Sequence, residues 1–417
     1  MPTAGIGVTR KGLNMTIEIR TCNDEEFAAG ISPIWQYFGE GPREEIVENF
    51  RRILPAGRIN AAFDGKEVVG SASAYPVKMT IPGGPVDVAG ITLVGVRPTH
   101  RRQGILSKLM KQLLEQAHSR GEPIASLWVA EETIYGRFGC GICSINGEIR
   151  IDRAHTHYRK HWQRTLAARQ VTHEEALESF PLVYQQVAPQ ISGMLSRTRA
   201  WWEVRQLLDD AAERHGTGPL LRVLFEQGGE PAGYALYSHR TEFVEGRTNS
   251  TLEVREAIGL DTDATAQVWR YLFDVDLMAQ IHAEYISIDH PLFFLLAEPR
   301  RLRYRAQDGI WLRLVDVEEA LRARSYTSGE QLVLELKDSF CPWNEGCYRI
   351  EEGEVSRAKG EADLRLDVRE LASAFMGGFS FSQLARAGLI EELRPGGIAC
   401  ADRLFASSPA PWCPEMF

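Results

Sequence analysis

The sequence predicts a multidomain protein of α/β and α+β class, with two similar mixed sheets followed by a smaller α+β unit. Strands and helices alternate from residue 16 to residue 151, and the same order recurs between residues 229 and 288. Short strands and short helices of a different pattern fill residues 309–405. Alternation of strand and helix is typical of mixed sheets that carry helices on their faces. A chain of 417 residues has room for roughly two to four domains.

The composition is that of an ordinary globular protein, with 44% hydrophobic and 25% charged residues. Because no apolar run reaches the roughly 18 residues that span a membrane, we expect no membrane partner. The net charge of −9 argues against nucleic acid as a partner and suits a cationic small molecule. Seven scattered cysteines, an odd number, favour free thiols in a reducing cytoplasm. Residues 1–14 lack the apolar core of a signal peptide, so we expect a disordered leader, with Met15 as an alternative start.

The first unit is predicted from apolar periodicity and turn residues. A helix over residues 24–38 has Asp24 as its candidate N-cap, and we expect Pro33 to break it. The sequence Asp64-Gly65 predicts a hairpin turn. The other expected elements are strands at 16–20, 58–63, 67–77, 86–96, 124–129 and 139–151, and a helix at 104–120.

The stretch from Ile91 to Leu106 predicts a phosphate-binding turn. A β-branched strand ends at Pro98, which cannot donate a ladder hydrogen bond. The basic turn 101–104 follows, and apolar residues then recur at helical spacing. A helix N-terminus presents free N–H groups and a positive dipole end, and Gly104 lets the backbone approach a ligand closely.

A weaker copy of this unit follows. Residues 229–235 resemble residues 66–72, and a strand at 252–257, a helix at 264–273 and a strand at 285–288 repeat the earlier order. The basic turn is replaced by Leu260-Asp261-Thr262-Asp263, whose charge would repel phosphate. We therefore expect a duplicated unit that has lost its phosphate site.

The last part of the chain predicts an α+β unit and an extended tail. Strands are expected at 331–337, 347–351 and 364–367, and helices at 368–375, 382–387 and 399–405. The tail 408–417 holds three prolines and should be extended. Because its last residues are unusually apolar, we expect it to dock rather than fray.

Three further groups of residues have two readings each. Trp35, Tyr37 and Phe38 beside Glu40 are either core aromatics or one wall of a cleft for a cation. Cys140 and Cys143 have the spacing of a redox or metal pair, but a second pair is not nearby in the sequence. His155, His157 and His161 lie in a polar connector, where solvated side chains are favoured over metal ligands. We expect no metal.

The basic turn is similar to the pyrophosphate-binding signature of GNAT acetyltransferases, Gln/Arg-x-x-Gly-x-Gly/Ala, except that Leu106 stands at its last position. The longer run Val94-Gly-Val-Arg-Pro-Thr-His-Arg-Arg-Gln-Gly-Ile-Leu106, with Tyr135-Gly-Arg-Phe-Gly139, resembles the Eis ("enhanced intracellular survival") branch of that superfamily. The resemblance implies an active GNAT domain at 15–158, a degenerate one at 159–304, and a sterol-carrier-like domain at 305–417 whose tail enters the active site. Members of this branch form hexamers, so it also implies a homo-oligomer.

The same resemblance assigns roles to individual residues. Tyr135 corresponds to the general acid, and the α-carboxylate of Phe417 corresponds to the general base. Acetyl-CoA, the cosubstrate, would be bound by Val94, Gly95, Val96, Arg101, Arg102, Gln103, Gly104, Ile105 and Leu106.

The resulting hypothesis is an acetyl-CoA-dependent N-acetyltransferase of polycationic amines such as aminoglycosides, acting at several positions of one molecule. One alternative is acetylation of protein lysines. The other is an apolar-ligand carrier with a regulatory GNAT part, in which Phe375, Phe379, Phe381 and Leu384 would line the ligand cavity.

Overall fold

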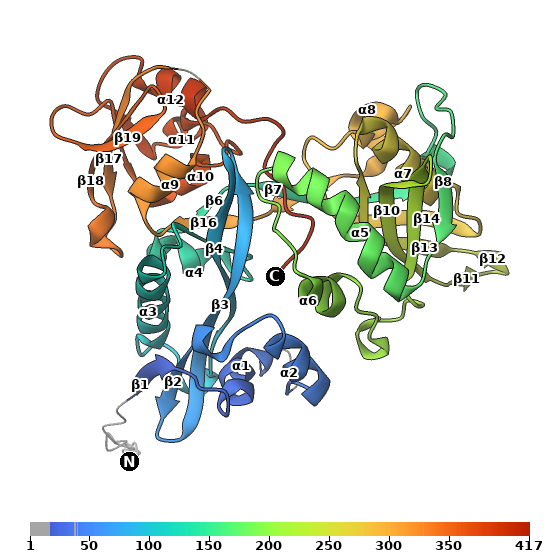
Figure 1. The fold of residues 1–417 in the computed structure, drawn as a ribbon, viewed down its shortest axis with the longest axis horizontal. Helices are drawn as coiled ribbons and strands as arrows, with labels where there is room; N and C mark the ends of the chain where they lie inside the picture. The colour runs from blue at the N-terminus through green and yellow to red at the C-terminus, as the bar shows by residue number, and fades with distance from the viewer. Residues whose placement is uncertain (1–16, 37–38, 40, 328) are drawn as a thin grey trace, which may run out of the picture.

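The computed structural model describes residues 17–36, 39, 41–327 and 329–417. The expected leader at 1–14 lies outside these residues, as do Tyr37, Phe38 and Glu40. The described chain folds into two seven-stranded sheets, one five-stranded sheet and a two-stranded hairpin, which Figure 1 shows as two halves joined at the centre. The mixed α/β and α+β class predicted from the sequence is confirmed.

The first sheet carries helices on its faces and holds the predicted phosphate-binding turn (Figure 1). Its spatial order is β1 (Glu18–Thr21), β2 (Ile59–Asp64), β3 (Glu67–Ile81), β4 (Gly84–Val96), β5 (Ile124–Leu127), β16 (Trp311–Leu314) and β6 (Gly141–Ile142). Its helices are α1 (Phe27–Trp35), α2 (Glu44–Arg51), α3 (Ile105–Ser119) and α4 (Glu132–Tyr135).

Helix α3 buries one apolar face against this sheet, as its periodicity predicted. Leu109, Met110, Leu113 and Leu114 are at most 2% exposed. Residues three and four apart lie on one face of a helix, so these four form a continuous stripe. This packing fixes the helix N-terminus beside the end of β4.

The start of α1 differs from the prediction. The helix begins at Phe27, and Asp24 does not cap it. Instead, Asn23 Oδ1 accepts a hydrogen bond from the Glu26 N–H, and the Glu26 side chain accepts one from the Asn23 N–H. This reciprocal pair closes a turn before the helix. Pro33 lies inside the helix, two residues before its end, so the prediction that it breaks the helix is wrong.

The second sheet repeats the topology of the first. Its order is β15 (Arg305–Asp308), β7 (Ile145–Asp152), β14 (Met278–Ser287), β13 (Ser250–Gly259), β10 (Glu230–Arg240), β9 (Leu221–Gln227) and β8 (Ala167–Gln170). The parallel pair β13–β14 is joined through α7 (Thr262–Asp274), just as α3 joins the parallel pair β4–β5. The unit also contains α5 (His173–Val187), α6 (Arg199–Trp201), α8 (Leu292–Leu295) and the hairpin strands β11 (Phe243–Val244) and β12 (Arg247–Thr248).

The two large sheets exchange strands, which the sequence did not reveal. The expected strand 139–151 is divided into β6, which stays in the first sheet, and β7, which lies in the second between β15 and β14. In return, β16 inserts into the first sheet between β5 and β6. The sheets therefore do not follow the boundaries expected near residues 158 and 304, because each is completed by a strand from beyond its boundary.

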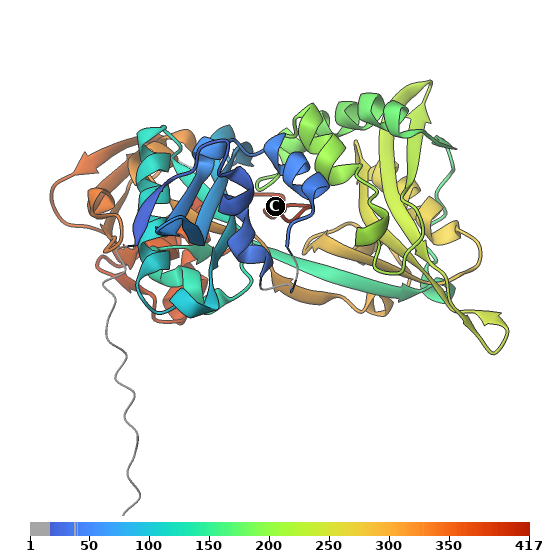
Figure 2. The ribbon, with the colours of Figure 1, turned by 90° about the horizontal axis from the view of Figure 1, so that it is seen from below.

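The third unit packs an antiparallel-rich sheet against short helices. Its order is β19 (Glu354–Ala358), β18 (Gly346–Glu351), β17 (Leu332–Lys337), β20 (Leu364–Asp367) and β21 (Ile390–Glu392). Its helices are α9 (Val317–Ala323), α10 (Val368–Ala374), α11 (Phe381–Arg386) and α12 (Gly397–Phe405). The tail then returns to the centre of the molecule, where the C-terminus lies between the two halves in both views (Figures 1 and 2).

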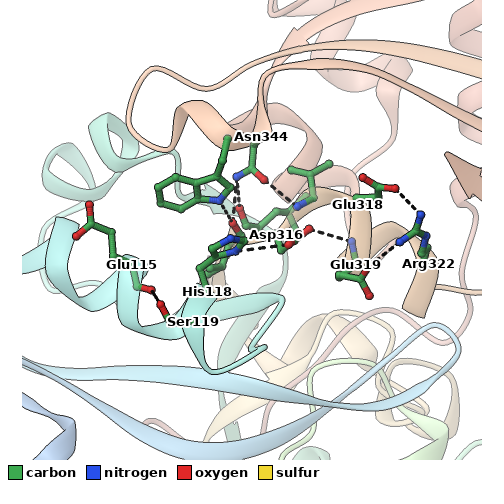
Figure 3. A network of polar contacts seen from close by, with 12 residues as sticks. Glu115, His118, Ser119, Asp316, Glu318, Glu319, Arg322 and Asn344 are labelled. Atoms are coloured by element: carbon green, nitrogen blue, oxygen red, sulfur yellow. Dashed lines mark hydrogen bonds and ion pairs between the residues drawn. The ribbon is translucent and has the colours of Figure 1, made fainter. Parts of the chain in front are cut away.

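The third unit contacts the end of α3 through the polar network drawn in Figure 3. His118 of α3 lies 3.5 Å from a carboxylate oxygen of Asp316, whose other oxygen accepts from the Glu319 N–H and so caps α9. Asn344 accepts from the Val317 N–H and donates to Asp338. These contacts join the helix of the first sheet to the start of the third unit.

Candidate active site

A cavity of about 700 Å³ lies at the end of β4, between the N-terminus of α3 and the segment around α4. It brings together most of the residues singled out from the sequence. Its lining includes Val94, Gly95, Val96, Arg101, Arg102, Gly104, Ile105, Leu106 and Tyr135. Gln103 lies in the same turn but is exposed and outside this lining, so its role stays a prediction.

Two features of strand pairing free the end of β4 that lines the cavity. On one side, β4 pairs in parallel with β5 from Val88 to Ile91, and the pair Ile91–Leu127 is the last. On the other side, Leu93 and Val94 together oppose one residue of β3, which is a β-bulge. Leu93 adopts φ 52°, in the left-handed region. The backbone beyond Ile91 is therefore turned out of the ladder with β5 and can bind a ligand.

The N-terminus of α3 supplies a positive end to the same cavity. Gly104 is the N-cap with φ 78°, and a side-chain cap is not formed there. Within the described first turn of α3 there is no Asp or Glu. The first N–H groups of a helix lack partners within the helix, so here they are available to an anion, and Arg101 and Arg102 add positive charge.

The second unit closes the corresponding position. Asp261 is the N-cap of α7, and its side chain accepts from the Ala264 N–H at 2.8 Å. Asp263 adds a second carboxylate in the first turn. The helix end is thus already capped by negative groups, an arrangement that disfavours the binding of a phosphate at this position.

Tyr135 reaches the cavity from α4 and is 9% exposed. Burial raises the pKa of its phenol to about 12, with a smaller contribution from Cys140. The hydroxyl is therefore protonated at neutral pH and is a hydrogen-bond donor. Such a group can donate a proton to a leaving group, but it cannot serve as a base near pH 7.

The loop that follows Tyr135 is packed tightly by β16 and the third unit. A Cβ atom at Gly139 would lie 2.5 Å from Nη1 of Arg313, and one at Gly141 would lie 2.1 Å from the Arg369 carbonyl oxygen. Arg313 is fully buried and pairs with Asp338 at 2.5 Å. Because neither glycine has space for a side chain, the third unit fixes the backbone that carries Tyr135.

The C-terminal residue is docked, as its apolar tail predicted. Phe417 is 7% exposed, and its ring packs against Gly90 of β4. Phe417 belongs to a large apolar core against which the half-buried Leu93 and Trp128 also pack. The tail therefore ends on the strand whose continuation lines the cavity.

The remaining candidates have other surroundings. Trp35 is half-buried at the end of α1 and packs edge-on against Phe50, with ring centroids 6.4 Å apart, so its role as an acceptor wall stays a prediction. Cys140 and Cys143 are free buried thiols, and His155 pairs with Glu298. Phe375 and Phe381 are fully buried in the core of the third unit, where Phe381 contacts Phe405.

Two aromatic residues at the junction of the halves were missed. Trp128, just after β5, packs edge-on against Tyr285, with ring centroids 5.3 Å apart. Tyr285 lies at an irregularity of β14 and adopts φ 55°, a strained conformation for a bulky residue. A tryptophan directly after a short buried strand was the one local signal available. Tyr285 had none, because its bulge depends on pairing with a distant strand.

Comparison with known families places acetyltransferase and lipid-carrier signatures along the chain. Models of the acetyltransferase (GNAT) domain match residues 18–143 and 193–314, and a model of the sterol carrier protein domain matches residues 317–414. Within the described residues, no helix is long and apolar enough to cross a membrane.

Similar proteins match over nearly the whole length. An uncharacterized N-acetyltransferase of Streptomyces avermitilis is 34% identical, over 97% of this chain and 100% of its own. The N-acetyltransferase Eis of Mycobacterium tuberculosis is 31% identical, over 84% of this chain and 85% of its own. The crystal structure of Eis1 from Mycobacterium abscessus is 31% identical, with a TM-score of 0.84 over 96% of this chain and 100% of its own.

Proposed function

The chain belongs to the Eis-type N-acetyltransferases of the GNAT superfamily, and we propose that it transfers acetyl from acetyl-CoA to amino groups of polycationic small molecules such as aminoglycosides, at more than one position. The observation that carries the proposal is the single cavity shared by the β4 bulge, the uncapped N-terminus of α3 and Tyr135. It joins an anion site, backbone donors and a proton donor.

Acetyl-CoA would bind with its pyrophosphate at the first turn of α3. Backbone N–H groups of residues 103–106 would hold the phosphate oxygens, and Arg101 and Arg102 would add charge. The pantetheine arm would run along β4 beyond Ile91, where pairing with β5 has ended. A backbone N–H at the Val94–Val96 segment would then donate to the thioester carbonyl and stabilise the oxyanion.

The reaction is direct transfer. The neutral amine attacks the carbonyl carbon, a tetrahedral oxyanion forms, and the C–S bond breaks as the carbonyl re-forms. The departing thiolate, with a solution pKa near 8.5, receives its proton from the Tyr135 phenol. Because the phenol has a pKa of about 12, it first stabilises the developing thiolate by a hydrogen bond, and the proton follows as the bond breaks.

The proton of the attacking amine goes to the α-carboxylate of Phe417, directly or through water. A free carboxylate with a pKa near 3.5 is a weak base, and desolvation would strengthen it. Docking of the Phe417 ring on Gly90 supports this role, since it brings the chain terminus to the strand that lines the cavity.

The surface beside the tail offers one contact for a cationic acceptor. A second cavity of about 720 Å³ is lined by residues 414–416 of the tail and by acidic and basic side chains, with Arg205 and Arg255 near Glu284 and Tyr285 in the lining. Glu284 is exposed and Tyr285 is half-buried, so a carboxylate and an aromatic ring could both contact an ammonium group.

A cytoplasmic location, supported by seven free cysteines, and a hexameric assembly belong to the same proposal.

The test is CoA release from acetyl-CoA with a panel of aminoglycosides and lysine peptides. Rapid release with aminoglycosides and products carrying two or more acetyl groups are expected. Release with lysine peptides alone would favour protein acetylation. If none of the amines in the panel causes CoA release, the proposal is wrong. Light scattering during size-exclusion chromatography tests the hexamer.

A further inference from the structure

The tail is held by a buried charge cluster that belongs to the second unit. Arg197 donates to both oxygens of Glu256, at 2.6 and 3.0 Å, and its Nε donates to Glu415 at 2.6 Å. The three side chains are 0%, 2% and 5% exposed. Because an unpaired buried charge is strongly destabilising, the guanidinium needs partners of this kind. One of them is two residues from the end of the chain.

A π-helical turn adds two more donors to the same carboxylate. Trp201 Nε1 donates to Glu415 at 2.7 Å, and Gln206 Nε2 also donates to it. Trp201 precedes the π-helical segment 202–206 and Gln206 ends it, and the Leu207 N–H bonds to the Trp202 carbonyl oxygen. A π-turn places residues five apart on one face, so Trp201 and Gln206 both point at Glu415.

Backbone contacts secure the residues on either side of Glu415. Asn146 donates to the Cys413 carbonyl oxygen at 3.0 Å, and Arg205 donates to the Met416 carbonyl oxygen at 2.6 Å. Phe417 packs on Gly90. Glu415 is therefore the one point in residues 413–417 where an ionised side chain, held by three side-chain donors, fixes the direction of the tail.

Burial energy alone does not explain this arrangement. Arg197 and Glu256 already form a neutral pair, and a second carboxylate adds a desolvation cost that an apolar residue at position 415 would avoid. A ring packed on a strand permits sliding and rotation, whereas three hydrogen bonds to one carboxylate define a single orientation. The charged anchor thus contributes direction more than stability.

We propose that Arg197, acting through Glu415, is a positioning residue that fixes the Phe417 carboxylate for proton transfer. In this arrangement the second unit provides the binding site for the tail. The inference rests on the proposed function, in which that carboxylate is the base. It gives the second unit a role in catalysis although Asp261 caps its own phosphate-site position.

The test compares Glu415→Ala and Glu415→Gln in the full chain, with Glu203→Gln as control. Glu203 lies on the same π-helical turn but pairs with Arg52 and Arg199, outside the cluster. Loss of the anchor should lower kcat about tenfold to a hundredfold, as expected for a misplaced catalytic group, and leave KM for acetyl-CoA within about twofold. Glu415→Gln keeps the length of the side chain and one acceptor oxygen and leaves the Arg197–Glu256 pair neutral. Its amide NH2 must face at least one of the three donors, so its kcat should lie between those of the parent and of Glu415→Ala.

Release of Phe417 by carboxypeptidase A gives a readout that is independent of turnover. Glu415→Ala should release phenylalanine faster than the parent when both proteins are kept well below their melting temperatures. If that variant melts much lower, Trp201→Phe, which removes one donor, replaces it, and a smaller decrease of kcat at unchanged KM is expected.

The two proposals fail differently. A residue added after Phe417 that leaves full activity would overturn the carboxylate mechanism and this inference with it. If that addition abolishes activity while Glu415→Ala keeps the parent's kcat and resistance to carboxypeptidase, the positioning role of Arg197 and Glu415 is wrong and the carboxylate mechanism stands.

Discussion

The ring of Phe417 lies against Gly90, so that a Cβ atom at Gly90 would be 3.4 Å from Cε2 of the last residue. Gly90 belongs to β4 and precedes the bulge at Leu93 and Val94. The end of the chain is thus brought to the strand that lines the cavity.

Replacement of Tyr135 by Phe removes the proposed proton donor and keeps the ring that fills its site. We expect kcat to fall at least about a hundredfold, since general acid catalysis contributes on that scale, with little change in acetyl-CoA affinity. Stopped-flow assays measure kcat, and calorimetry measures the affinity for acetyl-CoA. Because the phenol has a pKa of about 12, it stays protonated below that pH, and kcat should show no tyrosine-dependent decline up to about pH 10. A Tyr135→Phe enzyme with the parent's kcat would remove this residue from the mechanism.

Replacement of Arg102 by Gln should weaken acetyl-CoA binding about threefold to tenfold and reduce its salt dependence, because an exposed charge beside a phosphate is screened by salt. Lys111→Gln is the matched control: Lys111 lies on the same helix, is exposed and pairs with Glu115. Titration of acetyl-CoA at two salt concentrations measures both effects. Equal affinities for the two variants would argue against phosphate binding at this turn.

Replacement of Gly141 by Ala should destabilise the protein, because its Cβ would lie 2.1 Å from the Arg369 carbonyl oxygen and 2.5 Å from the Ser373 hydroxyl. We expect a melting temperature lower by about 3 °C or more, as is typical of overpacking, and a reduced kcat because the Tyr135 loop is displaced. A Cβ at Gly57 meets no atom within 4 Å, so Gly57→Ala should melt like the parent. Similar melting of both variants would show that the third unit does not fix this loop.

Acid should destabilise the second unit through His290. Burial lowers the pKa of this imidazole to about 4, although Asp289 opposes the shift. Between about pH 4 and 6.5 the unfolded chain binds a proton that the folded chain does not, so stability is complete above pH 6.5 and falls as pH decreases toward 4, by up to about 3 kcal/mol. Because Nδ1 accepts from the Leu292 N–H, His290→Asn can keep that bond without titrating.

Melting temperatures of parent and His290→Asn between pH 4.5 and 7 measure the difference. The parent should lose more stability than the variant over this interval. Parallel curves would mean that His290 is not buried in its neutral form.

Much of the fold was predictable because its signals are local. The stripe of Leu109, Met110, Leu113 and Leu114 specifies α3, and the acidic turn at Asp261 indicates a helix end that disfavours phosphate. The start of α1 was not predictable, since Asn23 rather than Asp24 closes the turn that precedes the helix. Which of two adjacent polar residues closes the turn depends on backbone geometry, and the sequence alone does not reveal that geometry.

The exchanged strands were beyond sequence reasoning. β16 pairs Leu312 with Ser126, and β7 pairs Ile149 with Ala283. A half-buried strand shows its own periodicity, but this periodicity does not specify which distant edge it joins. For the same reason the turn 101–104 of the candidate site was predictable, because its residues are adjacent in the sequence. The contact between Arg197 and Glu415, which are more than two hundred residues apart, was not.

The most direct test of the central claim changes only the terminal carboxylate. Residues 413–417 begin with a cysteine, so a synthetic pentapeptide ending in a carboxylate or in a carboxamide can be ligated to residues 1–412 carrying a C-terminal thioester. The two semisynthetic proteins then differ in one charged group. We predict that the carboxylate form has the kcat of the parent and that the carboxamide form loses at least about a hundredfold in kcat while binding acetyl-CoA equally well. Equal kcat values for the two forms would contradict a role for the Phe417 carboxylate as the base.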